Sequence, residues 1–221
     1  MCFSASVSFA TGGALLGASA LIYSKINLPR NSWYLASIPV IFGIHQCSEG
    51  LVWLGTEEQI SPLLAEIAKY FYAIIAICFW PFYIPLAMFW YQYPLHHIPL
   101  KIIIAIGAAV GLYLLWAITI ASPLWIRVNC DINSCESIAY LFKIPPFSSH
   151  LDKVYLAAVI IPFALAKNLR IRYILGPAFL GSFVLAKYLQ TMDNYPSIWC
   201  YLAAIISTII FYVLYIDSKK F

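Results

Sequence analysis

WYLASIPVIFGIHQCSEGLVWLG, residues 33–55, is the stretch that decides the fold of this chain. At about 1.5 Å per residue in a helix, it is long enough to cross a hydrocarbon layer of about 30 Å. Near one end it carries His45, Gln46, Ser48 and Glu49. A carboxylate inside an apolar span costs free energy, so Glu49 calls for a compensating partner or a function.

The composition of the whole chain agrees with a membrane protein. Of 221 residues, 63% are hydrophobic and 10% are charged, and the mean hydropathy is +0.85. Soluble domains carry about 25% charged residues. We therefore expect an all-α membrane protein whose partner is the lipid bilayer, built as one domain over residues 1–221. No basic cluster with interleaved aromatic residues indicates nucleic-acid binding.

Apolar runs predict seven transmembrane helices, at residues 4–23, 33–55, 63–92, 102–124, 153–167, 173–192 and 197–216. Pro81 and Pro85 should kink the third helix, because proline removes a helical hydrogen bond. Small residues predict close helix contacts in the first and fourth helices. They are Ala10, Ala14 and Ala18 with Gly13 and Gly17 beside them, and Gly107 with Gly111.

The distribution of charge predicts the orientation. Eight of the thirteen basic residues lie in alternate loops and at the C-terminus: Lys25, Arg30, Lys101, Lys167, Arg170, Arg172, Lys219 and Lys220. Seven of the nine acidic residues lie in or beside the other loops: Glu57, Glu58, Glu66, Asp131, Glu136, Asp152 and Asp193. Basic loops stay cytoplasmic. We expect the N-terminus outside and the C-terminus in the cytoplasm.

The longest outer loop covers residues 125–152 and contains Cys130 and Cys135. The two cysteines form either a small disulfide loop or two free thiols, since spacing alone does not set the geometry. Their spacing is too wide for a zinc knuckle and no second pair completes four ligands, so we expect no metal site. Residues 138–147 are apolar and aromatic, and either lie on the membrane surface or fold over the helix ends as a lid.

Glu49 and Lys187 each lie six residues before the predicted outer end of their helix. Both side chains are therefore expected at the same depth, about 9 Å below the helix end. Two ionisable side chains at matching depth suggest that both face the bundle interior and interact. The alternatives are a structural Glu49 bonded to hydroxyl groups and a Lys187 that extends to the interface. His45 lies one turn from Glu49 on the same face. With Glu49 it supplies only two ligands, so it is better interpreted as a core histidine.

Together these features predict an outward-facing polar pocket centred on Glu49. Its candidate ligand-binding residues are Glu49, His45, Gln46, Lys187, Tyr70, Trp53, Trp199, Cys200 and Cys2. The sequence identifies no catalytic residue, no cofactor and no oligomeric state.

Several short motifs resemble an uncharacterised bacterial multi-pass membrane family, a domain of unknown function. They are Met1-Cys2-Phe3-Ser4-Ala5 with Ser8-Phe9, Phe42-Gly43, Gln46, Glu49-Gly50, Val52-Trp53, Phe79-Trp80-Pro81 and Trp199-Cys200. The resemblance implies a location in the bacterial inner membrane and marks these residues as family features. Position 45 is often glutamine in that family, which makes His45 the more dispensable member of the pocket.

Three functions fit these observations. The first is a transporter or receptor that binds a small ligand or ion around Glu49, with kinks at Pro81 and Pro85 supporting opening. The alternative is an intramembrane enzyme acting on a lipid or small amphiphile, with Glu49 as acid or base and Cys2 or Cys200 as nucleophile. A third is a chromophore protein with Lys187 as a Schiff base, although this lysine is in the penultimate helix.

Overall fold

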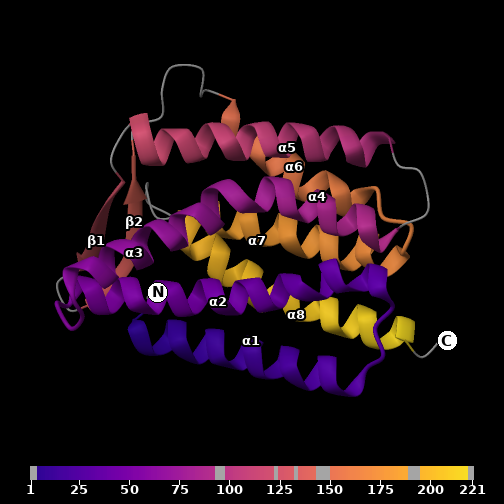
Figure 1. The fold of residues 1–221 in the computed structure, drawn as a ribbon, viewed down its shortest axis with the longest axis horizontal. Coiled ribbons are helices and arrows are strands. Elements are labelled where there is room, and N and C mark those ends of the chain that lie inside the picture. The colour runs from indigo at the N-terminus through magenta and orange to yellow at the C-terminus, as the bar shows by residue number, and fades with distance from the viewer. Residues whose placement is uncertain are drawn as a thin grey trace.

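The computed structural model describes residues 4–92, 98–121, 124–131, 134–142, 150–188 and 195–218. Over these residues the helical segments join into seven rods that lie side by side (Figure 1). The helices are α1 (Ala5–Lys25), α2 (Trp33–Thr56), α3 (Pro62–Ala73), α4 (Trp80–Tyr91), α5 (Ile98–Trp116), α6 (Leu151–Ala164), α7 (Gly176–Tyr188) and α8 (Tyr195–Ser218). A 3-10 turn, Arg30–Ser32, precedes α2, and π-helical segments at Ile74–Phe79, Ala117–Ala121 and Ile171–Leu175 join α3 to α4, extend α5 and precede α7.

Five of these helical stretches are long and apolar enough to cross a membrane. They are Ala5–Lys25, Arg30–Thr56, Pro62–Tyr91, Ile98–Ala121 and Ser197–Ser218. Outward-facing apolar side chains are strongly exposed; Leu112 is 67% exposed and Ile120 is 76% exposed. Such a surface is stable in lipid and unfavourable in water, so the chain is a membrane protein. α6 has 14 residues and α7 has 13, and both are shorter than the predicted fifth and sixth spans.

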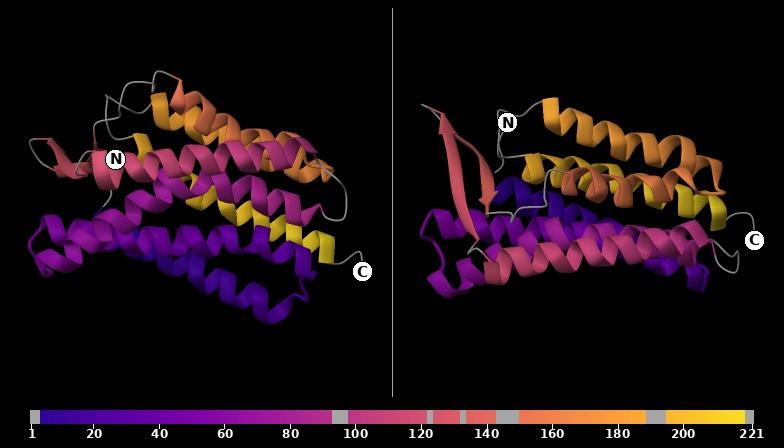
Figure 2. Two further views of the ribbon diagram at one scale, coloured as in Figure 1. Left: turned by 45° about the horizontal axis from the view of Figure 1, so that its top comes forward. Right: turned by 90° about the horizontal axis from the view of Figure 1, so that it is seen from above.

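The bundle has two distinct ends (Figures 1 and 2). The two strands and the start of α8 lie at one end, and the α1–α2 connection and the C-terminus lie at the other. At the C-terminal end, Arg170 Nη1 lies 3.6 Å from Asp217 Oδ1, and the Tyr91 hydroxyl donates a hydrogen bond of 2.6 Å to Asp217 Oδ2. The α6–α7 connection, the end of α4 and the end of α8 therefore meet there, as the alternation of charged loops predicts.

The expectation of an all-α fold is wrong for the longest outer loop. Strands β1 (Trp125–Asp131) and β2 (Ser134–Leu141) form an antiparallel hairpin within the predicted loop 125–152. Alternating Ile126 and Val128, with Ile138 opposite Val128, give this stretch the β-branched period of two that favours strands. We call these two strands the hairpin.

The predicted close packing of the fourth span is confirmed. A Cβ atom on Gly107 would lie 1.8 Å from the carbonyl oxygen of Pro81, and one on Gly111 would lie 2.3 Å from that of Cys78. α5 thus packs directly on the backbone where the π-helical segment Ile74–Phe79 passes into α4. The predicted irregularity of the third span therefore begins just before Pro81.

The predicted packing face of the first helix is wrong. A Cβ atom on Gly13 or Gly17 would meet nothing within 4 Å, and Ala10 and Ala14 are exposed. α2 instead approaches Gly12, where a Cβ atom would lie 2.7 Å from the carbonyl oxygen of Gly43. Spacing alone allows two stripes of small residues on this helix, and the stripe that contacts α2 also carries the buried serines of α1.

Candidate functional site

Glu49 lies at the centre of the candidate site and is fully buried. Ser197, in the first turn of α8, donates a hydrogen bond to Glu49 Oε1. Residues three and four apart share a helix face, so α2 directs His45, Gln46 and Trp53 to the same side as Glu49. His45 and Gln46 are fully buried, and Trp53 is 3% exposed. The predicted polar face of residues 33–55 is therefore an interior face.

Three rings form a stack beside this carboxylate. The ring centroids of His45 and Tyr72 are 4.1 Å apart, and those of Tyr72 and Tyr140 are 4.4 Å apart. The stack joins α2, α3 and β2, and Tyr72 and Gln46 also face the Glu49 carboxylate. Burial, together with the nearby Glu49 charge, raises the pKa of Tyr140 well above its usual value. Tyr140 therefore keeps its proton and remains a hydrogen-bond donor.

Many buried polar atoms of this cluster lack a hydrogen-bond partner within the described part of the chain. They are both ring nitrogens of His45, both amide atoms of Gln46, Glu49 Oε2, Trp53 Nε1, Tyr72 OH and Tyr140 OH. Each unpaired buried polar group costs about 1–3 kcal/mol. Such a concentration of unpaired buried groups is unusual in a folded protein, so this cluster is the candidate functional site.

The hairpin covers this site. Ile138 and Ala139 are fully buried and Tyr140 is 5% exposed. The sequence allows residues 138–147 either to lie on the membrane surface or to fold over the helix ends as a lid. The described residues 138–142 adopt the second arrangement. The base of the hairpin is held by α3, since Lys69 Nζ donates a 2.8 Å hydrogen bond to the carbonyl oxygen of Leu124.

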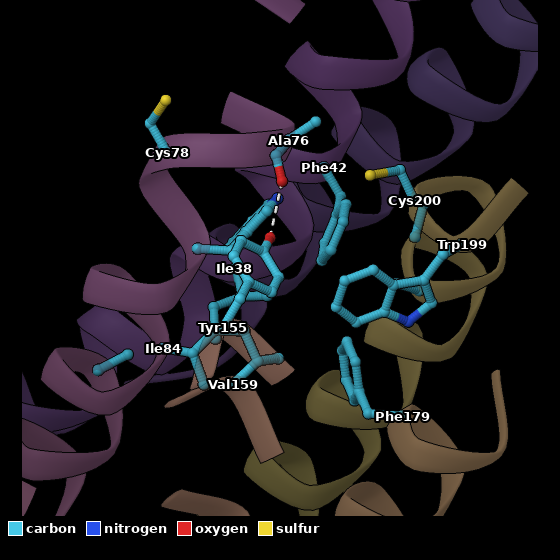
Figure 3. Close-up of a cluster of buried hydrophobic side chains, with 14 of the residues drawn as sticks. Ile38, Phe42, Ala76, Cys78, Ile84, Tyr155, Val159, Phe179, Trp199 and Cys200 are labelled. Atoms are coloured by element: carbon cyan, nitrogen blue, oxygen red, sulfur yellow. Dashed lines mark hydrogen bonds between the residues drawn. The ribbon is translucent and has the colours of Figure 1, made fainter. Parts of the chain in front are cut away.

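An apolar wall separates the site from the middle of the bundle. Phe42, Phe179 and Trp199 gather near Cys200 (Figure 3), around a cavity of about 10 Å³. That volume holds about one water molecule. Trp199 Nε1 donates a 3.2 Å hydrogen bond to Ser182 Oγ, which fixes the indole against α7. The wall leaves no room for a lipid chain beside Cys200.

The remaining predicted site residues do not share one location in the fold. Tyr70 accepts a 3.4 Å hydrogen bond from the Leu124 backbone and supports the hairpin. Cys200 is 3% exposed and lies beside Tyr72. Lys187 is exposed, with Nζ 5.9 Å from the centroid of the Phe183 ring. Of the two alternatives for this lysine, the exposed position fits extension to the interface and not an interior pair with Glu49. Cys2 lies outside the described residues.

Sequence reasoning missed Tyr72, Tyr140 and Ser197 as site residues. Ser197 lies one turn before Cys200 on α8, and that spacing was a usable signal. Tyr140 belongs to the aromatic run that the sequence allows as a lid. Nothing in the sequence distinguishes Tyr72 from the other tyrosines of its helix.

The chain belongs to DUF6629, a family of unknown function whose model matches residues 1–220. The resemblance to a domain of unknown function is thereby confirmed. No curated protein and no solved structure matches the chain.

Proposed function

We propose that this protein binds or transports a small ligand or ion in a closed intramembrane pocket centred on Glu49. The observation that supports it best is the gathering of unpartnered buried polar groups around one carboxylate, within the residues that the structure describes. A structural role for Glu49 alone would be served by one or two hydrogen bonds and would leave no reason for the neighbouring His45, Gln46 and Tyr72 to be polar.

The proposal includes seven membrane spans, with the hairpin outside, the C-terminus in the cytoplasm and the bacterial inner membrane as the location. The basic residues at the C-terminal end support this orientation. The pocket then lies near the outer surface, with the hairpin between it and the outside. Ligand entry requires movement of β2 away from Tyr72.

An intramembrane enzyme with Cys200 as nucleophile is the second candidate. It is favoured by one observation, that Cys200 and Glu49 both lie beside Tyr72. The cavity next to Cys200 has a volume of about 10 Å³, which is too small for a lipid chain, so it disfavours a lipid substrate. Cys200→Ser separates the two functions, because a binding protein keeps its ligand response and an enzyme loses turnover.

The test is a ligand screen by thermal unfolding of purified protein, comparing wild type with Glu49→Gln. A ligand at 100 times its Kd stabilises the folded state by about 2.7 kcal/mol. We expect at least one ion or small solute to stabilise wild type and not Glu49→Gln. Ser207→Ala is the matched control, because Ser207 is buried in α8 and bonds the Ala204 carbonyl oxygen of its own helix. The proposal is wrong if Glu49→Gln responds to every stabilising solute as wild type does.

A further inference from the structure

We propose that the species bound at Glu49 is a small monovalent inorganic cation, held by oxygen atoms. The inference rests on the proposed function and names the class of ligand. It follows from charge, from the kind of atoms that surround the carboxylate, and from the full burial of Glu49.

The charge argument begins with the basic side chains nearest in the fold. Lys69 Nζ is directed to Glu66 Oε1 at 2.7 Å and to the carbonyl oxygen of Leu124. Lys187 is exposed over Phe183. Among the residues that the structure describes, no ion pair to Glu49 is found. A buried carboxylate without a positive neighbour is stable only when a proton or another cation neutralises it.

The atoms around the carboxylate favour a hard cation. Ser197 Oγ contacts Glu49 Oε1, and Tyr72 and Gln46 face the same carboxylate. Tyr140 contributes a further buried hydroxyl group above Tyr72. Hydroxyl, amide and carboxylate oxygens suit hard cations, whereas thiolate and imidazole sets suit transition metals.

The count of charges favours a single positive charge. Within the described ranges no group of three or more His, Cys, Asp or Glu side chains gathers as a metal site would require. One carboxylate neutralises a monovalent ion and leaves a divalent ion with an uncompensated buried charge. Full burial of His45, Gln46 and Glu49 also restricts the occupant to a small species.

The surroundings of Glu49 hold no fixed positive charge within the residues that the structure describes. The titratable groups that interact with Glu49 are Tyr72 from α3, Tyr140 from β2 and Cys200 from α8, and His45 lies one turn away on the same face of α2. None of these side chains carries a fixed positive charge, so a bound cation would supply the charge that the carboxylate lacks.

The experiment measures the thermal unfolding midpoint of purified full-length protein in detergent, at constant ionic strength with choline as the replacement ion. NaCl, KCl and LiCl are each varied from about 1 to 100 mM at about pH 6, 7 and 8.5, a range wide enough to bracket a Kd near 1 mM. At that Kd we expect the best cation to raise the midpoint by roughly 5–10 °C at the highest pH.

Glu49→Gln should lose this response, and Glu66→Gln should keep it, because Glu66 is an exposed carboxylate outside the pocket. Tyr72→Phe retains the ring stack and removes one oxygen, so it should weaken the cation affinity even if Glu49→Gln fails to fold. A midpoint that depends on pH but on no alkali cation overturns the cation inference. Glu49-dependent stabilisation by a neutral or anionic solute overturns it while supporting the proposed function. A wild type that responds to neither pH nor any solute through Glu49 overturns both.

Discussion

Replacing Ser197 by alanine tests whether the pocket is arranged around the Glu49 carboxylate. Ser197 is 1% exposed, and its hydroxyl donates to Glu49 Oε1. Because Glu49 Oε2 has no partner in the described structure, the variant removes the hydrogen bond to Oε1 and leaves Tyr72 and Gln46 as the polar side chains that face the carboxylate. Leaving a buried acceptor unsatisfied costs about 1–3 kcal/mol. For a chain of this size, a cost of about 2 kcal/mol corresponds to a fall of about 4–8 °C in Tm.

Ser207→Ala provides the matched comparison, since it removes a buried hydroxyl from the same helix. Its Oγ donates a 2.6 Å hydrogen bond to the Ala204 carbonyl oxygen, which already belongs to the helix, so the cost should stay below about 1 kcal/mol. The measurement is thermal unfolding in detergent, followed by a double-mutant cycle with Glu49→Gln. Interacting residues should be non-additive by at least about 0.5 kcal/mol. Equal losses in the two serine variants, or additive effects with Glu49→Gln, would refute the arrangement.

Two further predictions concern packing and the hairpin. Gly107→Ala should lower the free energy of unfolding by about 1–3 kcal/mol or more, because the new methyl group overlaps the Pro81 carbonyl oxygen. Gly181→Ala is the control and should be neutral in the same unfolding assay, because a Cβ atom on Gly181 meets nothing within 4 Å. Cys130 and Cys135 are cross-strand neighbours in the hairpin register, and we expect them to form a disulfide outside the cytoplasm. Mass spectrometry after alkylation without reductant should find both thiols protected, and labelling of both would contradict the bond.

The helical architecture was largely predictable, because membrane solvation forces long apolar runs into helices. Gly107 and Gly111 were identified correctly from spacing alone. The face of the first helix was assigned wrongly, because two stripes of small residues share it and only one meets α2. Hydropathy also favoured short helices such as α6 as complete spans, although its 14 residues fall below the usual length.

The candidate site was predictable along one helix and less so between helices. His45, Gln46 and Glu49 share a face by periodicity, and the structure places all three in the interior. Lys187 was assigned to the interior from its depth along the helix, but depth contains no information about rotation around the axis. Tyr72 and Tyr140 reach the site through helix adjacency and strand pairing, which depend on the packing of distant segments.

The hydrogen bond between Ser197 and Glu49 joins residues 148 positions apart. At a synthesis rate of about 5–20 residues per second, Ser197 leaves the ribosome roughly 7–30 s after Glu49. During membrane insertion Glu49 must therefore stay neutral, hydrated or shielded by the insertion machinery until the last helix docks. A nascent chain truncated before residue 195 would carry Glu49 in the bilayer without this hydrogen bond.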